Sequence, residues 1–143
     1  MRRGRARAGA VLLVFVMFVT ACGSPEPRRS PDEAVLFARS GGLAGAPQRL
    51  AIAPDGKAVL AQAGSTPVEA QLTPSERDHL RSALDQAVFS APPRLPPGQP
   101  DTFTYSVTFR GKTVEMSETT VPPGLRELLR VLVGITNRLT RKG

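Results

Sequence analysis

Residues 102–109 read TFTYSVTF, and this segment decides the fold because apolar and hydroxyl side chains alternate along it without a break. Such an alternation predicts a β-strand with one face in the core and the other toward solvent. The apolar members, which would share the core face, are Phe103, Tyr105, Val107 and Phe109. Arg110-Gly111-Lys112 then predicts a turn into a second strand over residues 113–117, where Val114 and Met116 continue the pattern.

Helical patterns flank these two strands on both sides. Thr73-Pro74-Ser75-Glu76 supplies an N-cap hydroxyl, a proline at the first helical position and a glutamate at the third, which together predict the start of a helix. Its apolar stripe consists of Leu80, Ala83, Leu84, Ala87 and Val88. This helix is expected to end by Ser90, before a proline-rich segment. A second helix should open at Pro122-Pro123, with a stripe formed by Leu125, Leu128, Leu129, Leu132, Ile135 and Leu139.

Three further strands are expected before the first helix, over residues 34–39, 48–53 and 58–62. Pro54-Asp55-Gly56-Lys57 separates the last two, and an Asp-Gly pair between apolar runs is typical of a type I′ hairpin turn, whose two central positions need φ > 0. The predicted order is β-β-β-α-β-β-α. The sequence therefore predicts an α+β fold, a small antiparallel sheet with two helices packed on one face.

The N-terminal segment predicts export and lipidation. Residues 1–7 carry four arginines and no acid, and the apolar run over residues 10–20 is too short to span a bilayer core of about 30 Å. Val19-Thr20-Ala21-Cys22 resembles the bacterial lipobox, which implies cleavage before Cys22 and a lipid on its thiol. The expected location is therefore the outer face of the bacterial cytoplasmic membrane, with the protein held there by its lipid.

This segment also sets the expected domain organisation. Residues 1–21 would be a lipoprotein signal peptide, and residues 22–32 the lipidated cysteine and a flexible, proline-containing tether. Residues 33–143 would form a single domain with a short basic tail.

Composition argues against several classes of function. The formal net charge is +7, but residues 30–137 hold ten basic and eleven acidic side chains, so a nucleic-acid surface is not expected. The chain has one histidine, His79, and one cysteine, so neither a zinc site nor a Ser-His-Asp arrangement is expected. Asp78 and Asp85 are interpreted as acids on a solvated helix face. We therefore predict a non-enzyme without a metal or cofactor.

Two loops and one strand face are candidates for recognition. The candidate partner-binding residues are Ser40, Gly41, Gly42, Leu43, Ala44 and Gly45. This loop is either a turn at a strand end with Leu43 tucked into the core, or a narrow loop that enters a partner's cleft. The proline-rich segment at residues 91–100 is either a stiff crossover or a preordered contact. The hydroxyl-rich strand face, a weaker candidate for small-ligand binding, is formed by Thr102, Thr104, Ser106 and Thr108.

The order and spacing of Ser40-Gly41-Gly42, Asp101-x-Phe103-x-Tyr105 and the terminal leucines resemble the emfourin family over roughly residues 34–134. Emfourins are small bacterial inhibitors of thermolysin-like metalloproteases such as protealysin. The resemblance implies that this chain binds and inhibits such a protease, although the lipoprotein signal and the tether depart from the family pattern. An alternative is a non-catalytic envelope lipoprotein that acts as a structural or protein-interaction module.

The resemblance also suggests how the glycine loop would act. Thermolysin-like enzymes favour a bulky apolar residue just after the scissile bond, so Gly42-Leu43 is similar to a substrate bond held rigidly. Rigid presentation would lower the ordering cost of binding.

Overall fold

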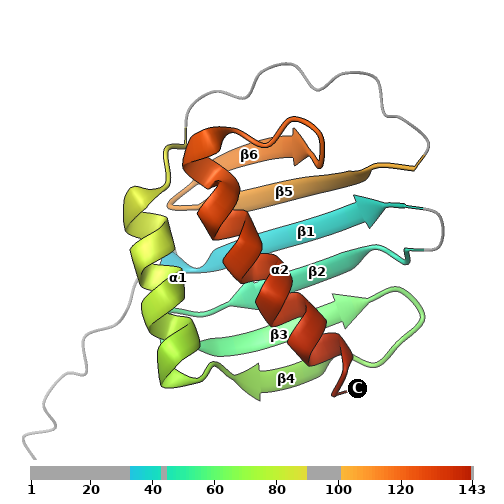
Figure 1. The fold of residues 1–143 in the computed structure, drawn as a ribbon. Coiled ribbons are helices and arrows are strands. Elements are labelled where there is room, and N and C mark those ends of the chain that lie inside the picture. The colour runs from blue at the N-terminus through green and yellow to red at the C-terminus, as the bar shows by residue number, and fades with distance from the viewer. Residues whose placement is uncertain (1–32, 43–44, 90–100, 143) are drawn as a thin grey trace, which may run out of the picture.

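A computed structural model of the chain describes residues 33–42, 45–89 and 101–142. These residues form two layers, a six-stranded antiparallel sheet and two helices that both cover the same face of it (Figure 1). The strands are β1 (Val35–Gly41), β2 (Gln48–Ile52), β3 (Lys57–Gln62), β4 (Val68–Gln71), β5 (Phe103–Phe109) and β6 (Lys112–Ser117). The helices are α1 (Pro74–Gln86) and α2 (Arg126–Thr140), the latter preceded by a 3-10 turn over Pro123–Leu125. The predicted α+β architecture is confirmed.

Several predicted features lie outside the described residues. They are the signal peptide and tether over residues 1–32, with the lipidation site Cys22, the loop residues Leu43 and Ala44, and the proline-rich segment at residues 91–100.

The sheet has the order β4-β3-β2-β1-β5-β6, so β1 lies between β2 and β5. Phe37 on β1 is opposite Leu50 on β2 and Val107 on β5, and all three side chains are almost completely buried. The pairing of β1 with β5 joins the N-terminal and C-terminal halves of the domain. It also determines which loops meet at each end of the sheet.

The sheet contains one strand that the sequence analysis did not predict. β4 is only four residues long and pairs with β3 at the edge of the sheet. Its side chains are alternately half-buried and exposed, without a fully buried position, so its sequence VEAQ carries little apolar pattern. The order along the chain is therefore β-β-β-β-α-β-β-α.

The core lies between the sheet and the two helices. On β5 the predicted alternation is observed, because Tyr105 and Val107 are buried in the same core as the leucines of α2. The stripe predicted for the second helix is buried along its whole length, and Leu132 at its centre has no exposed surface. Burial of apolar surface contributes about 25 cal/mol per Å², so these large aliphatic side chains between the sheet and the helices are the main source of the domain's stability. Every residue of the core belongs to the segment Val35–Leu139.

Two local predictions are corrected by the structure. Val88 is 60% exposed because α1 ends at Gln86 and Ala87 takes an extended conformation, which moves the next residue off the apolar stripe. The turn between β2 and β3 is a hairpin but not type I′, because only Gly56 has a positive φ there. The hydrogen bond from the Gly56 N–H to the Ala53 carbonyl makes Pro54 and Asp55 the central pair of the turn, and the fixed φ of Pro54, near −65°, is incompatible with type I′ at that position.

The type I′ geometry occurs instead at the other hairpin. Arg110 and Gly111, between β5 and β6, both have positive φ, of 49° and 72°. These two residues are the central pair of a two-residue loop, since Phe109 is paired directly with Lys112.

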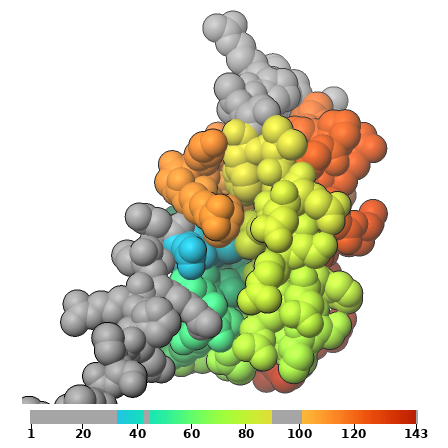
Figure 2. Space-filling model, turned by 90° about the vertical axis from the view of Figure 1, so that its left-hand side faces the viewer, coloured from blue at the N-terminus to red at the C-terminus, as the bar shows by residue number. Residues whose placement is uncertain are grey.

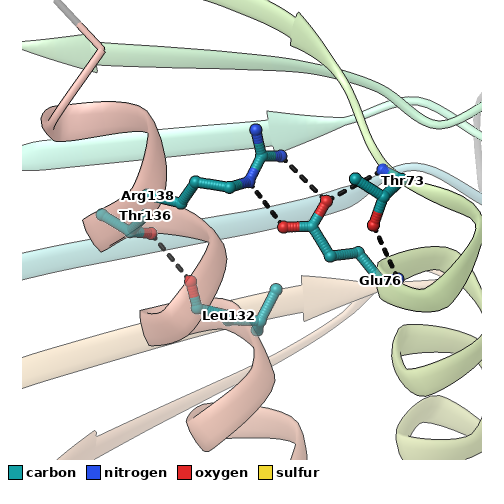
Figure 3. A network of polar contacts seen from close by, with 5 residues as sticks. All are labelled: Thr73, Glu76, Leu132, Thr136 and Arg138. Atoms are coloured by element: carbon teal, nitrogen blue, oxygen red, sulfur yellow. Dashed lines mark hydrogen bonds and ion pairs between the residues drawn. The ribbon is translucent and has the colours of Figure 1, made fainter.

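The two helices are tied together by a polar network that starts at the N-terminus of α1 (Figure 3). Thr73 and Glu76 form the predicted capping box, in which each side chain accepts a hydrogen bond from the backbone N–H of the other. Glu76 also accepts hydrogen bonds from Nε and Nη2 of Arg138 on α2, at 2.6 and 2.9 Å. A second anchor within α2 is the buried hydroxyl of Thr136, which donates to the carbonyl of Leu132 at 2.9 Å.

The ionisation of Glu76 reflects this network. Burial by itself raises the pKa of the Glu76 carboxyl, but the hydrogen bonds from Thr73 and Arg138, together with the Arg138 charge, outweigh burial and lower the pKa below its ordinary value. Glu76 is therefore ionised at neutral pH and holds the first turn of α1 against α2.

Candidate functional site

The glycine loop and the aromatic motif of β5 are distant in sequence but adjacent in the structure. Because β1 and β5 are antiparallel neighbours, Ser40 pairs with Thr104 and Gly41 pairs with Phe103. The two short motifs that carried the family resemblance therefore form one site at an end of the sheet. Ser40, Gly41 and Gly45 are exposed, so this end is open to a partner.

Close packing explains why this loop needs glycine. Gly41 and Gly42 have φ of +91° and +78°, a conformation that side chains disfavour. A Cβ on Gly41 would lie 2.5 Å from the carbonyl oxygen of Thr102, and one on Gly42 would lie 2.7 Å from the ring of Phe103. The backbone of the loop thus rests directly on the start of β5.

The third glycine of the loop closes the turn on itself. A Cβ on Gly45 would lie 2.7 Å from the carbonyl oxygen of Gly41, so the returning chain runs against the outgoing chain. The described part of the loop is therefore narrow and sterically restricted.

Arg39 is the residue at this site that the sequence analysis did not single out. Val35, Phe37 and Arg39 alternate along β1, so Arg39 shares the face on which the first two are buried. Its guanidinium carbon lies 3.7 Å from the centroid of the Phe103 ring, a cation–π contact. Its Nε is buried and has no hydrogen-bond partner. The sequence did contain a sign of this, because a charged residue stands at a position of the strand where the alternation calls for an apolar one.

Arg39 belongs to a cross-strand row at the edge of the core. The register places Gln62 opposite Gln48, Gln48 opposite Arg39, and Arg39 opposite Tyr105. Nε2 of Gln48 donates to the side-chain oxygen Oε1 of Gln62 at 3.2 Å and to the Thr140 hydroxyl, at the end of α2, at 3.3 Å. The glutamines are therefore tied to each other and to α2, whereas Arg39 is held by an aromatic ring.

A small hollow opens beside this row, with a volume of about 150 Å³. It is lined by Arg39, Gly41, Gly45, Ala46, Gln48, Gln62 and Phe103. Nearby, burial raises the pKa of the Tyr105 phenol, and the Glu118 carboxylate raises it further against the opposing charge of Arg39. The raised pKa keeps the Tyr105 phenol neutral at neutral pH, and among the described residues Arg39 is the only charged side chain that lines the hollow.

Two other hollows lie in the described part of the chain. One, of about 300 Å³, lies between α1 and the sheet end at which β1 begins, an end shown in Figure 2. Its charged lining residues, of both signs, are Glu33, Arg77, Arg81, Asp85 and Arg110. Glu33 and Arg110 are 4.0 Å apart and both exposed, so this pair is solvated and contributes little.

The other hollow lies on the sheet face opposite the helices and includes the hydroxyl-rich surface. It has a volume of about 350 Å³, and Leu36 beside it is 51% exposed. Ser106 and Thr108 line it, but the Thr108 hydroxyl is within 2.8 Å of the Thr113 hydroxyl and already has a partner. Arg49 also lines this surface, and its other lining residues are apolar.

The residues considered for catalysis do not form a cluster. Asp78, His79 and Asp85 are exposed on α1, as predicted for a solvated face. Among the described residues, no three His, Cys, Asp or Glu side chains lie close enough together to hold a metal ion. Within the same ranges, no helix has the length and apolar character needed to cross a bilayer.

Comparison with known proteins identifies the family. The Emfourin family model matches residues 58–132, which run from β3 into α2 and include Phe103 and Tyr105. This chain belongs to the Emfourin family. A comparison with curated proteins gave no match. In this emfourin domain the glycine loop and Arg39 precede the matched segment, and they reach it through the pairing of β1 with β5.

Proposed function

We propose that this emfourin is a membrane-anchored bacterial lipoprotein that inhibits a thermolysin-like metalloprotease by blocking its cleft with the glycine loop. Family membership supports an association with metalloprotease inhibition. The observation that supports the rest is the packing of Gly41 and Gly42 against Thr102 and Phe103, which restricts the described part of the loop.

Inhibition follows from the way such a loop would meet the enzyme. A flexible peptide loses conformational entropy when it enters a cleft, whereas a loop already held by its own fold loses less and binds more tightly. In this proposal the Gly42-Leu43 bond takes the place of the scissile bond, with Leu43 as the bulky apolar residue that follows it. The packed glycines keep the loop from relaxing along the reaction, which slows its hydrolysis.

The position of the loop suits an anchored inhibitor. The chain enters β1 at Val35 and leaves it at Gly41, so the glycine loop lies about 20 Å along the strand from the point of entry. In Figure 1 these two points are at opposite ends of the sheet. A lipid on Cys22 would therefore hold the domain by one end and present the loop at the other.

The contact is tested with Leu43→Ala in the soluble chain from residue 24 onward, which contains the whole described core. We expect the variant to unfold at the same urea concentration as the wild type but to inhibit at least about tenfold more weakly, because one bulky anchor is lost. Undiminished inhibition would exclude the Gly42-Leu43 contact. Anchoring is tested separately, since Cys22→Ala should move the full-length protein from the membrane fraction to the soluble fraction.

A further inference from the structure

Arg39 is half-buried, and its guanidinium forms no salt bridge with a described residue. Its Nε is buried without an acceptor, and its recorded contact is with the Phe103 ring at 3.7 Å. A buried donor without an acceptor costs about 1–3 kcal/mol, and more when the group is charged, so native proteins retain few of them.

The cation–π contact with Phe103 does not use the hydrogen-bond donors of Arg39. The guanidinium is planar and its N–H groups point outward in that plane, while the contact with an aromatic ring uses only the flat face. The ring therefore fixes the orientation of the fork without occupying any of its hydrogen bonds. This is the preorganised arrangement in which two parallel N–H groups can bind a carboxylate.

The surroundings of Arg39 fit one small anionic group. The adjoining hollow of about 150 Å³ is equivalent to about five water molecules. Among the described residues that line it, the other polar side chains are the amides of Gln48 and Gln62, and none is a carboxylate. Gly41 and Gly45 form part of the same wall, so a group bound there would lie beside the glycine loop.

We propose that Arg39 forms a carboxylate-binding subsite that receives an aspartate or glutamate side chain of the protein engaged by the glycine loop. This inference rests on the proposed function and deepens it, because it assigns the partner an acidic residue at the edge of its cleft. The guanidinium fork would supply a paired, desolvated ion contact, which contributes specificity as well as affinity. Phe103 would act in two ways, by supporting the loop glycines and by orienting Arg39.

Inhibition kinetics give the first test, with a thermolysin-like protease that the wild-type chain inhibits. Arg39→Met and Arg39→Lys should each weaken inhibition about tenfold or more, because the lysine keeps the charge but loses the fork and the stacking. Arg49→Met is the matched control, since Arg49 is exposed on β2 and does not line this hollow, and it should inhibit like the wild type. Equal inhibition by Arg39→Met and the wild type would overturn the proposal.

A second measurement does not depend on any protease, so that failure of the subsite can be separated from failure of the proposed function. In the ¹⁵N-labelled chain from residue 24 onward, the Arg39 Nε–Hε resonance is assigned by its loss in Arg39→Met. At constant ionic strength, acetate should shift this resonance saturably, whereas chloride should not. No saturable shift would overturn the subsite, and an equal response to inorganic phosphate would overturn its assignment to a carboxylate.

Discussion

Two half-buried arginines in this domain have opposite surroundings. Arg138 on α2 is paired with Glu76, which accepts hydrogen bonds from its Nε and Nη2 at 2.6 and 2.9 Å (Figure 3). Arg39 on β1 lies over the Phe103 ring, and its buried Nε has no acceptor. Both arginines lie at the margin of the same core.

The difference separates a structural contact from one that awaits a partner. The pair of Arg138 and Glu76 joins the two helices beside the capping box, so both side chains have hydrogen-bond partners within the fold. At the glycine-loop end the backbone is tightly packed, but the buried Nε of Arg39 has no hydrogen-bond acceptor. We interpret the helix junction, formed by Glu76 and Arg138, as a contact that stabilises the fold, and the glycine-loop end as a surface for recognition.

The largest effect on stability is expected from Gly41→Ala at the glycine-loop end. The new Cβ would lie 2.5 Å from a backbone carbonyl oxygen at a residue with φ of +91°. Strain in φ and the steric clash together should lower the free energy of unfolding by about 3 kcal/mol, as measured by urea denaturation.

Gly111→Ala is the matched control for this variant. Gly111 also has a positive φ, of 72°, but a Cβ there would meet no atom within 4 Å. Only the conformational cost, about 1 kcal/mol, is expected. Equal losses for the two variants would show that the loop is not sterically fixed by β5.

A smaller effect is expected when each arginine is replaced by methionine. Arg138→Met should lower the free energy of unfolding by about 2 kcal/mol, because Glu76 loses two charged hydrogen bonds. Arg39→Met should change it by less than about 1 kcal/mol, since the lost stacking is offset by removal of an unsatisfied donor. Similar losses for both variants, measured by denaturation at neutral pH, would remove the distinction between the two arginines.

The pH dependence of stability gives the smallest predicted effect, and it should be confined to the helix junction. The folded-state pKa of Glu76 is lowered from 4.5, so its contribution is complete above pH 4.5 and is lost as the pH falls through the folded value. Denaturation of the wild type and Glu76→Gln between pH 7 and pH 3 should show the two stabilities converging as the pH falls. A constant difference across this range would contradict a role for the Glu76 charge.

Much of the fold could be predicted from the sequence because most elements carry their own pattern. The alternation on β5, the capping box at Thr73 and the leucine stripe of α2 are each visible in a single segment. β4 has no such pattern, since its four residues are an edge strand stabilised by pairing with β3. The prediction that Val88 lies on the apolar stripe was wrong because α1 ends before it, at the extended Ala87.

The candidate site could be predicted only in part. The three glycines were visible as an unusual composition, but the surface that requires them comes from β5. Arg39 could be identified as a site residue only once the strand pairing placed it opposite Tyr105 and its Nε was seen to lack a hydrogen-bond partner. Contacts between distant strands depend on register, and register is a property of the whole sheet.

The most direct test of the central claim is a titration of a thermolysin-like protease with the soluble chain from residue 24 onward, using a short peptide substrate. The account predicts that activity falls in proportion to added chain and is abolished near equimolar amounts. Mass spectrometry should then show the Gly42-Leu43 bond intact. Full activity with excess chain across a panel of such proteases would contradict inhibition and favour a non-catalytic interaction module of the envelope.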